Sequence, residues 1–283
     1  MTDKLFIIGN GFDLYHGLKT MYSDFRDYIV KKKSGLWNLL HDVYGDTITK
    51  DMWWSNFEEM LGHVNYMNLL ESNNGIPPSP SKVKNLLKGS LPPLFGEWIN
   101  KMDANVQRDE NLKIDETSLF FSFNYTLLLE KVYGVKDENI WHIHNSVMTP
   151  DDIVVGHDSD DRILFSRWNE FKKENNIDFN WNDIIDNINR DVANNAKKVN
   201  QRIEINKDRF YELYSGIKHF VVMGFSFNDI DMPYIEKIIG VNENISKVEW
   251  KIYYHIEGEN EAIIDKLLKL GVNRGSITNP VKW

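Results

Sequence analysis

The chain has 283 residues, a length that accommodates one large domain or two small ones at roughly 100–200 residues per domain. Apolar residues make up 42% and charged residues 27%, which is ordinary for a soluble globular protein. The 33 basic and 42 acidic residues give a net charge of −9, which argues against coating nucleic acid through charge alone but leaves a local basic groove open. The absence of cysteine excludes disulfides, thiolate zinc sites, iron–sulfur clusters and cysteine nucleophiles.

The N-terminus lacks the pattern of a secretory signal peptide. Its apolar run covers only residues 5–8 before glycine and polar residues follow. No stretch approaches the ~20 consecutive apolar residues that a membrane span needs. We therefore expect a cytoplasmic protein without membrane contact.

Six short apolar runs predict buried strands, and most of them are continuous rather than alternating. Continuous runs are typical of parallel strands that are covered on both faces. The runs are residues 5–8, 118–123, 140–144, 153–155, 220–223 and 248–254.

Longer segments between these runs have apolar residues at three- and four-residue steps, which predicts helices over 20–33, 51–70 and 260–270. Strands separated by helices predict an α/β fold with a mostly parallel, Rossmann-like sheet. We expect one domain over 1–283, enlarged by helical insertions at about 33–116 and 158–218. These insertions either cover the sheet or form a lid or a partner surface.

Ligands of open α/β sheets bind outside the carboxyl ends of the strands, so the residues after each run are the candidate site. After the first run come Gly9, Asn10, Gly11, Phe12 and Asp13. Two glycines one residue apart allow a tight turn whose N–H groups approach a phosphate. The third glycine of the dinucleotide motif is absent, so an ordinary strand–helix turn remains the alternative.

The other runs also end in small or polar residues. They are followed by 124–126, by His144 and Asn145, by 156–158, and by a segment with Gly224, Ser226 and Asp229. Each is explained singly by a turn or a helix cap, but five such ends together predict a site. We predict no metal centre, because His142 and His144 have no carboxylate at close spacing.

The order and spacing of these segments resemble the AbiH family of phage abortive-infection proteins. The specific part is 6–13, which reads Phe-Ile-Ile-Gly-Asn-Gly-Phe-Asp. The remaining matches are short and extend over nearly the whole chain; they are 16–20, 22–25, Trp54, Phe57, Glu58, 123–126, 142–145, 224–226 and 229–231. The resemblance implies a role in antiphage defence.

More remotely, the layout resembles the sirtuin-like NAD-binding fold. Residues 9–19 are similar to its glycine-rich opening segment, with Lys19 in place of a proline. By this resemblance Asn124 and His144 occupy the catalytic positions, although Thr126 replaces an aspartate and Asn145 a glycine. The zinc ribbon of protein deacylases needs four cysteines and is impossible here, which argues against a lysine deacylase.

The resemblance implies that NAD is the substrate or ligand of a glycohydrolase that releases nicotinamide. In NAD, nicotinamide is already a good leaving group from ribose, so the enzyme needs only to hold the ribose, stabilise the transition state and deliver water. His144 would take a proton and Asn124 would position water or hydroxyls. The residues predicted to bind NAD are Gly9, Asn10, Gly11, Phe12, Asp13, Gly224, Ser226 and Asp229.

Two alternative functions stay open at this stage. One is a nucleotide-binding sensor or scaffold without turnover, and another is a nuclease effector. Glu58 is either a solvated helix carboxylate or a further member of the site. A phage-derived trigger, a partner protein and self-association are also left open by the sequence.

Overall fold

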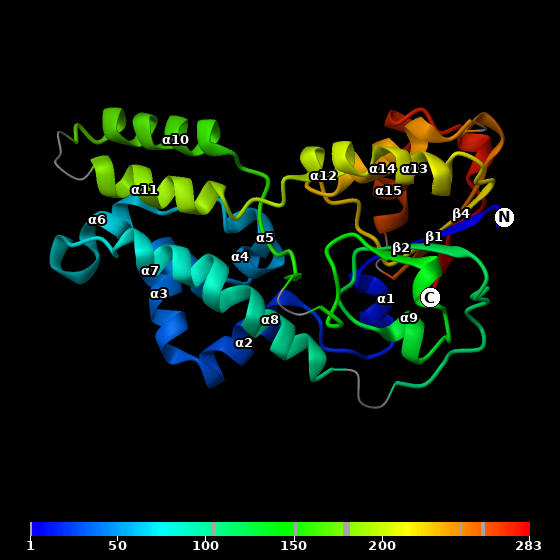
Figure 1. Ribbon diagram of the computed structural model, residues 1–283, viewed down its shortest axis with the longest axis horizontal. Helices are drawn as coiled ribbons and strands as arrows, with labels where there is room; N and C mark the ends of the chain where they lie inside the picture. The colour runs from blue at the N-terminus through cyan, green and yellow to red at the C-terminus, as the bar shows by residue number, and fades with distance from the viewer. Residues whose placement is uncertain (1, 103–105, 150–151, 178–181, 244, 256–257) are drawn as a thin grey trace. The chain divides into compact units, whose positions relative to one another are not determined.

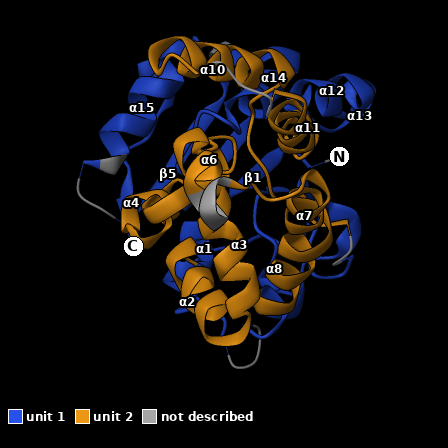
Figure 2. Ribbon diagram, turned by 90° about the vertical axis from the view of Figure 1, so that its left-hand side faces the viewer, with its two compact units in different colours: residues 1–20, 99–149, 199–283 blue, residues 21–98, 150–198 orange. Residues whose placement is uncertain are grey.

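The computed structural model describes residues 2–102, 106–149, 152–177, 182–243, 245–255 and 258–283. The chain forms two compact units, each made of separate segments. Unit 1 contains residues 1–20, 99–149 and 199–283, and unit 2 contains residues 21–98 and 150–198 (Figure 2). The expectation of a single domain with insertions at 33–116 and 158–218 stays a prediction; residues 103–105 and 178–181 of those segments lie outside the described residues.

Unit 1 is built on a six-stranded sheet in which every pairing within the described ranges is parallel. The strand order is β3-β2-β1-β4-β5-β6, and Leu5 of β1 lies between Leu119 of β2 and Phe220 of β4. The strands are β1 (Lys4–Ile8), β2 (Leu119–Ser122), β3 (Ile140–His142), β4 (His219–Met223), β5 (Glu249–Tyr254) and β6 (Val281–Lys282).

Helices lie on both faces of this sheet (Figure 1). Alternate strand residues point to opposite faces, so Leu5 and Ile7 belong to one core and Phe6 and Ile8 to the other. The first core is completed by α12 (Val199–Ile205), α13 (Lys207–Tyr214), α14 (Met232–Val241) and α15 (Glu259–Lys269). The second is completed by α1 (Asn10–Tyr15), α9 (Leu128–Lys131) and neighbouring loops.

The chain changes direction across the sheet between β1 and β4. The strands β2 and β3 are added on one side of β1, whereas β4, β5 and β6 are added on the other. The carboxyl ends of β1 and β4 therefore lie side by side at a topological switch point, where open α/β sheets bind ligands. The segments after Ile8 and Met223 meet at this place.

Five of the six predicted strands are confirmed as β1 to β5, with ends that differ by at most two residues. The prediction at 153–155 is wrong, because this run belongs to unit 2 and forms no strand. Ile153 and Val155 are buried, and the Val155 carbonyl accepts a bond from Asn195, so the run packs without a neighbouring strand. The sequence missed β6, which is exposed and lacks an apolar run.

All regular secondary structure in the described residues of unit 2 is helical. Its core is aromatic: Phe25 packs against Phe95 and Trp98 with ring centroids 5.1 Å away in each case. The helices are α2 (Tyr22–Lys32), α3 (Ser34–Tyr44), α4 (Asp51–Ser55), α5 (Phe57–Met60), α6 (Tyr66–Gly75), α7 (Pro80–Lys84), α8 (Leu91–Asn100), α10 (Asp161–Glu174) and α11 (Asn182–Ala193).

The helices predicted at 20–33 and 260–270 are confirmed as α2 and α15. The continuous helix predicted over 51–70 is wrong, because the chain breaks into α4, α5 and α6. One break is at Asn56, which has non-helical dihedral angles. The other includes Gly62, where a β-carbon would lie 2.9 Å from the ring of His157. None of the helices in the described ranges is long and apolar enough to cross a membrane.

Candidate functional site

The glycine turn after β1 packs directly against the turn after β4. A β-carbon on Gly9 would lie 2.5 Å from Phe225 Cα, and one on Gly11 would lie 2.6 Å from Gly224 Cα. Gly224 has a φ of +64°, which favours glycine. The glycines predicted to bind a phosphate are therefore required for the contact between two backbone turns.

The backbone amides of this turn are already used within the protein. Gly9 N–H donates to the Met223 carbonyl at 3.0 Å, and Gly11 N–H donates to the Gly224 carbonyl at 2.9 Å. Phe12 N–H donates to the Gly9 carbonyl at 2.9 Å. These three N–H groups are already bonded to protein carbonyls, so the turn does not offer them to a pyrophosphate.

Asp13 connects α1 to the segment after β2. Its carboxylate is buried, and the Thr126 hydroxyl lies 2.9 Å from both of its oxygens. Phe12 is buried in the sheet core, and the exposed Asn10 donates its amide to the Thr20 carbonyl. Asp13 and Thr126 thus fix the two loops that carry the rest of the site.

Asn124, the second residue after β2, has a buried side chain that is only 6% exposed. Neither its amide nitrogen Nδ2 nor its amide oxygen Oδ1 has a hydrogen-bond partner among the described residues. Most buried polar side-chain atoms are hydrogen-bonded to protein or ordered water, and an exception requires an explanation. A ligand or water that accepts one bond and donates another would satisfy both atoms.

His144 follows β3 and is 2% exposed. Its ring is surrounded by the rings of Phe123, Tyr125 and Tyr234, with centroids 5.7–6.2 Å away. Its Nε2 lies 3.3 Å from Oδ1 of Asp231. The next residue, Asn145, has a left-handed φ of 61°, a conformation that asparagine adopts more readily than most other side chains.

A second histidine fixes the backbone of the same loop. His142 Nδ1 donates to the Asn124 carbonyl at 2.8 Å, and Nε2 lies 2.9 Å from a carboxylate oxygen of Glu130. Both ring nitrogens of His142 therefore face oxygen atoms of neighbouring groups. His142 therefore links the backbone of Asn124 to the side chain of Glu130.

Tyr234 of α14 adds a further buried polar atom. Its hydroxyl has no hydrogen-bond partner within the described ranges. Burial raises the pKa of Tyr234 far above its usual value, and nearby Asp231 raises it as well, whereas Arg202 lowers it. The hydroxyl therefore stays protonated and available as a donor or an acceptor.

The loop after β4 carries two aspartates that differ in their burial. Asp229 is exposed and pairs with Lys266 at 3.0 Å, and Ser226 is exposed too. Asp231 is buried beside His144. Its sequence signal is its position immediately before Met232 and Pro233, the usual place of an N-cap.

Glu58 belongs to a separate buried cluster in unit 2. Its carboxylate lies 2.9 Å from Lys197 Nζ, and the Lys197 side chain is completely buried. His157 lies, like Lys197, in the segment 150–198 of unit 2. Its Nε2 donates to the Val192 carbonyl and its Nδ1 accepts from Ser159 N–H. Burial lowers the pKa of His157 to about 4, so its ring is neutral at pH 7.

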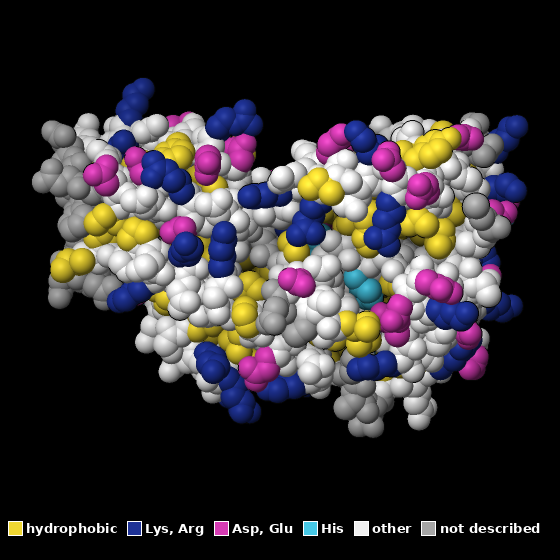
Figure 3. Space-filling view, in the orientation of Figure 1, with side chains coloured by type: hydrophobic (Ala, Val, Ile, Leu, Met, Phe, Trp, Pro, Cys, Tyr) yellow, Lys and Arg dark blue, Asp and Glu magenta, His cyan; other side chains and the backbone are white. Residues whose placement is uncertain are grey.

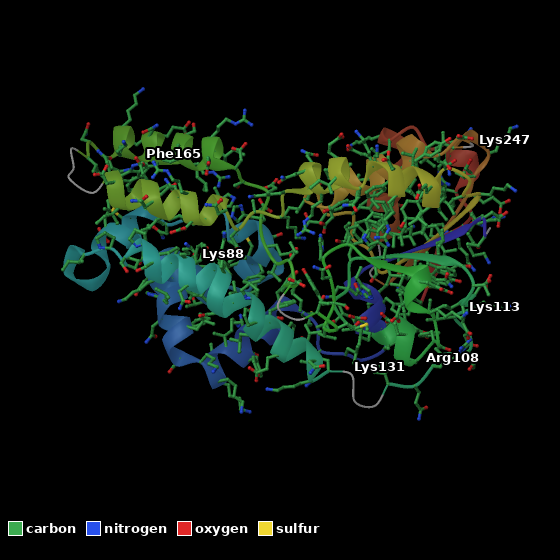
Figure 4. All side chains as sticks on the ribbon, viewed as in Figure 1. Lys88, Arg108, Lys113, Lys131, Phe165 and Lys247 are labelled. Atoms are coloured by element: carbon green, nitrogen blue, oxygen red, sulfur yellow. The ribbon has the colours of Figure 1, made fainter. Side chains whose placement is uncertain are left out.

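The charged surface of unit 1 is mixed. Acidic and basic side chains alternate on the face in Figure 3. Arg108, Lys113 and Lys247 lie at separate places around the sheet (Figure 4), and Arg108 is paired with Glu116 at 2.7 Å. The described part of the chain contains no group of three or more metal-ligating side chains.

Comparison with known proteins identifies one family. The model of the family described as bacteriophage abortive infection AbiH matches residues 5–86 and 79–254. These ranges include Asn124, His144, Asp231 and Glu58. No curated protein matches the chain.

Proposed function

The chain belongs to the AbiH family of bacteriophage abortive-infection proteins, and we propose that it acts in this defence by cleaving NAD to nicotinamide and ADP-ribose. The observation that carries the proposal is the buried Asn124 amide with both polar atoms unpartnered among the described residues. It lies one residue beyond Phe123, whose ring packs against that of His144. A neutral amide and a histidine that follow two neighbouring strands of the sheet are suited to a substrate rich in hydroxyl groups.

The strand order supports a nucleotide ligand. The order β3-β2-β1-β4-β5-β6 is that of the Rossmann-like sheets that bind dinucleotides at the switch point. Asn124, His144 and Asp231 follow β2, β3 and β4 at the carboxyl edge of this sheet. The sirtuin-like interpretation rests on this arrangement and on the matched positions of Asn124 and His144.

The proposed reaction is hydrolysis of the bond between ribose C1′ and the nicotinamide nitrogen. Water attacks C1′, the C1′–N bond breaks, and neutral nicotinamide leaves with the bonding electrons. His144 takes the proton that water loses, and Asn124 orients the water or the ribose hydroxyls. The rings of Phe123, Tyr125 and Tyr234 around His144 exclude bulk water from this step.

The residues fit one part of NAD better than another. The Asn124 amide and the Tyr234 hydroxyl match ribose hydroxyls, because each offers a hydrogen-bonding atom without charge. The turn at Gly9 and Gly11 fits a pyrophosphate less well, since its amides bond to the protein. We therefore propose that Gly9, Gly11 and Gly224 shape the site, and that the phosphates are held elsewhere. Direct binding by Asn10, Phe12, Asp13, Ser226 and Asp229 stays a prediction.

The test is nicotinamide release from NAD, followed by chromatography. Wild-type protein is compared with Asn124→Ala and His144→Ala, and Thr117→Ala, which changes an exposed residue outside the site, serves as the control. We expect release by the wild type and the control, and at least a ~100-fold loss in both site variants. Protection of cells against phage should be lost in parallel.

Other outcomes separate the alternatives. If the protein protects cells and binds a nucleotide but releases no nicotinamide, it acts as a sensor and not as an enzyme. Cleavage of RNA or DNA while NAD survives would replace it by a nuclease. Full phage protection by both site variants would contradict the site itself.

A further inference from the structure

We propose that unit 1 carries a further binding site, a pocket on the face of β1, β4 and β5 that takes a small organic phosphate, a phosphate monoester on a compact apolar body. The pocket has a volume of about 270 Å³, and its lining contains no residue of the candidate site. Pockets for drug-sized ligands are usually larger, so this one suits a small molecule and not a dinucleotide. The proposal therefore does not rest on the proposed function.

The pocket forms where one face of the sheet is left open. The helices that follow β4 and β5, which are α14 and α15, pack on the face that Leu5 shares. On the opposite face, α1 and α9 belong to the core around Phe6. Over β4 and β5 this opposite face reaches solvent, because Val221 is half-buried and Lys251 is exposed.

The strand register arranges the lining as a polar row beside an apolar floor. Lys4, His219 and Glu249 are cross-strand neighbours, each at the first residue of its strand. Alternate residues of a strand point to the same face, so the floor consists of the apolar side chains further along the same face. They are Phe6, Val221, Met223 and Tyr253. Neighbouring strands are only ~4.8 Å apart, so one small molecule can contact both the row and the floor.

Three lysines from separate segments surround this floor. Lys4 belongs to β1, Lys251 to β5, and Lys113 to the segment between α8 and β2 (Figure 4). Lys4 Nζ reaches a carboxylate oxygen of Asp115 only at 3.9 Å. Within the described ranges, Lys113 and Lys251 have no carboxylate at ion-pair distance, and Lys251 Nζ lies 4.7 Å from the centre of the Tyr253 ring. Two ammonium groups can therefore pair with an external anion.

The lining has the opposite charge to the whole chain, whose net charge is −9. Its described residues contain the three lysines and one carboxylate, that of Glu249. This carboxylate lies 3.2 Å from Nδ1 of His219. The nearby Asp115 accepts bonds from the N–H and the hydroxyl of Thr117. A concave surface with an excess of one charge concentrates ions of the other sign, so the ligand is an anion.

A phosphate monoester matches the lining better than a carboxylate does. Its phosphate carries a charge of about −1.5 to −2 and three acceptor oxygens, so several lysines can bind it at once. Lysine binds phosphate as a compact charge on a flexible stem, and the three stems here start from different segments. The apolar floor requires in addition that the phosphate is attached to an organic body, which inorganic phosphate lacks.

The probe is phenyl phosphate, titrated calorimetrically into the full chain at low ionic strength. We expect saturable binding with a Kd of about 1 mM or tighter, and at least about tenfold weaker binding of inorganic phosphate and of phenol. Lys113→Gln and Lys251→Gln should each weaken binding by about threefold or more, and added salt should weaken it further. Lys269→Gln is the matched control, because it removes the same charge from an exposed position in α15 and should leave the Kd unchanged.

A second readout locates the ligand. The methyl NMR signals of Val221 and Met223 should shift during the titration, and Asn124→Ala should bind phenyl phosphate as the wild type does. This result is independent of NAD cleavage, so failure of the proposed reaction leaves it standing. A Kd weaker than about 1 mM, equal binding of inorganic phosphate or phenol, or an unchanged Kd in either lysine variant would overturn the proposal. Methyl signals that stay in place on saturation would overturn it as well.

Discussion

The two compact units each contain a buried polar cluster, and the clusters differ in how their hydrogen bonds are satisfied. In unit 2, Lys197 pairs with Glu58 at 2.9 Å, and both nitrogens of His157 are bonded to backbone. In unit 1, both polar atoms of the buried Asn124 amide are unpartnered in the part of the chain that the structure describes.

This difference suggests a division of roles between a buried cluster that stabilises the fold and one that binds a ligand. A satisfied buried network specifies and stabilises the packed structure, whereas a buried polar group without a partner costs free energy. A ligand that supplies the missing bonds would offset this cost. We therefore assign the cluster of unit 2 to folding and the cluster of unit 1 to binding, and the following changes test that division.

The largest expected effect is that of Asn124→Ala. Nicotinamide release should fall by about 100- to 1,000-fold, as for the loss of one aligned hydrogen-bonding group. The free energy of unfolding should hardly change, because no side-chain bond is lost. The measurements are steady-state kinetics and urea unfolding.

Asn242→Ala is the matched control within unit 1. This buried asparagine donates to the carbonyls of Tyr214 at 3.1 Å and Ile217 at 2.8 Å. Its loss should cost about 1–3 kcal/mol of stability while activity is kept. The comparison fails if Asn124→Ala destabilises the protein as much as Asn242→Ala does.

The next effect is that of breaking the buried ion pair of unit 2. Lys197→Met leaves Glu58 buried without this cation and should cost about 3–5 kcal/mol in the free energy of unfolding. The double variant Lys197→Met/Glu58→Leu should recover part of that loss. The exposed Arg162, changed to Gln, is the control and should be neutral. A neutral Lys197→Met would show that the pair does not stabilise unit 2.

A smaller effect is the pH dependence due to His157. Burial lowers its pKa from 6.5 to about 4, so the unfolded chain binds a proton over this range while the folded chain does not. Its contribution is complete above about pH 6.5 and is lost as the pH falls toward 4, by at most about 3 kcal/mol. Urea unfolding between pH 4 and 7 measures it, and His157→Gln should flatten the curve. An equally steep curve for that variant would assign the dependence to other groups.

The smallest effect should be a gain in stability at Gly35. This glycine lies in α3, is exposed, and has open space where a β-carbon would be. Gly35→Ala should therefore raise the free energy of unfolding by about 0.5 kcal/mol, with no change in nicotinamide release. Thermal unfolding is sensitive enough to detect it. A loss of stability would show that the start of α3 requires glycine.

The sheet and part of the site were predictable because their signals are local. Continuous apolar runs predicted β1 to β5, and strand ends at a common edge brought Asn124 and His144 into the candidate site. The strand predicted at 153–155 is absent because an apolar run shows only that the segment is buried. It does not show whether the segment packs beside another strand or against helices.

The remaining features depend on contacts between distant segments. The sequence predicted that the amides of Gly9 and Gly11 would bind a phosphate. In the structure they donate to the carbonyls of Met223 and Gly224, which are distant in sequence. Glu58 looked solvated, yet its partner Lys197 lies 139 residues away in sequence. The burial of Asp231 and the exposure of Asp229, only two residues apart, depend on the conformation of the loop after β4, in which Phe227 has a left-handed φ.

The most direct test of the central claim is calorimetric measurement of NAD binding by a variant that cannot turn NAD over. The His144→Ala protein is titrated with NAD, beside the double variant His144→Ala/Asn124→Ala. We predict saturable binding to the first and at least about tenfold weaker binding to the second, which corresponds to about 1.4 kcal/mol. Equal affinities would contradict the assignment of the Asn124 amide to the ligand, and absence of saturable binding to either protein would contradict NAD as the ligand.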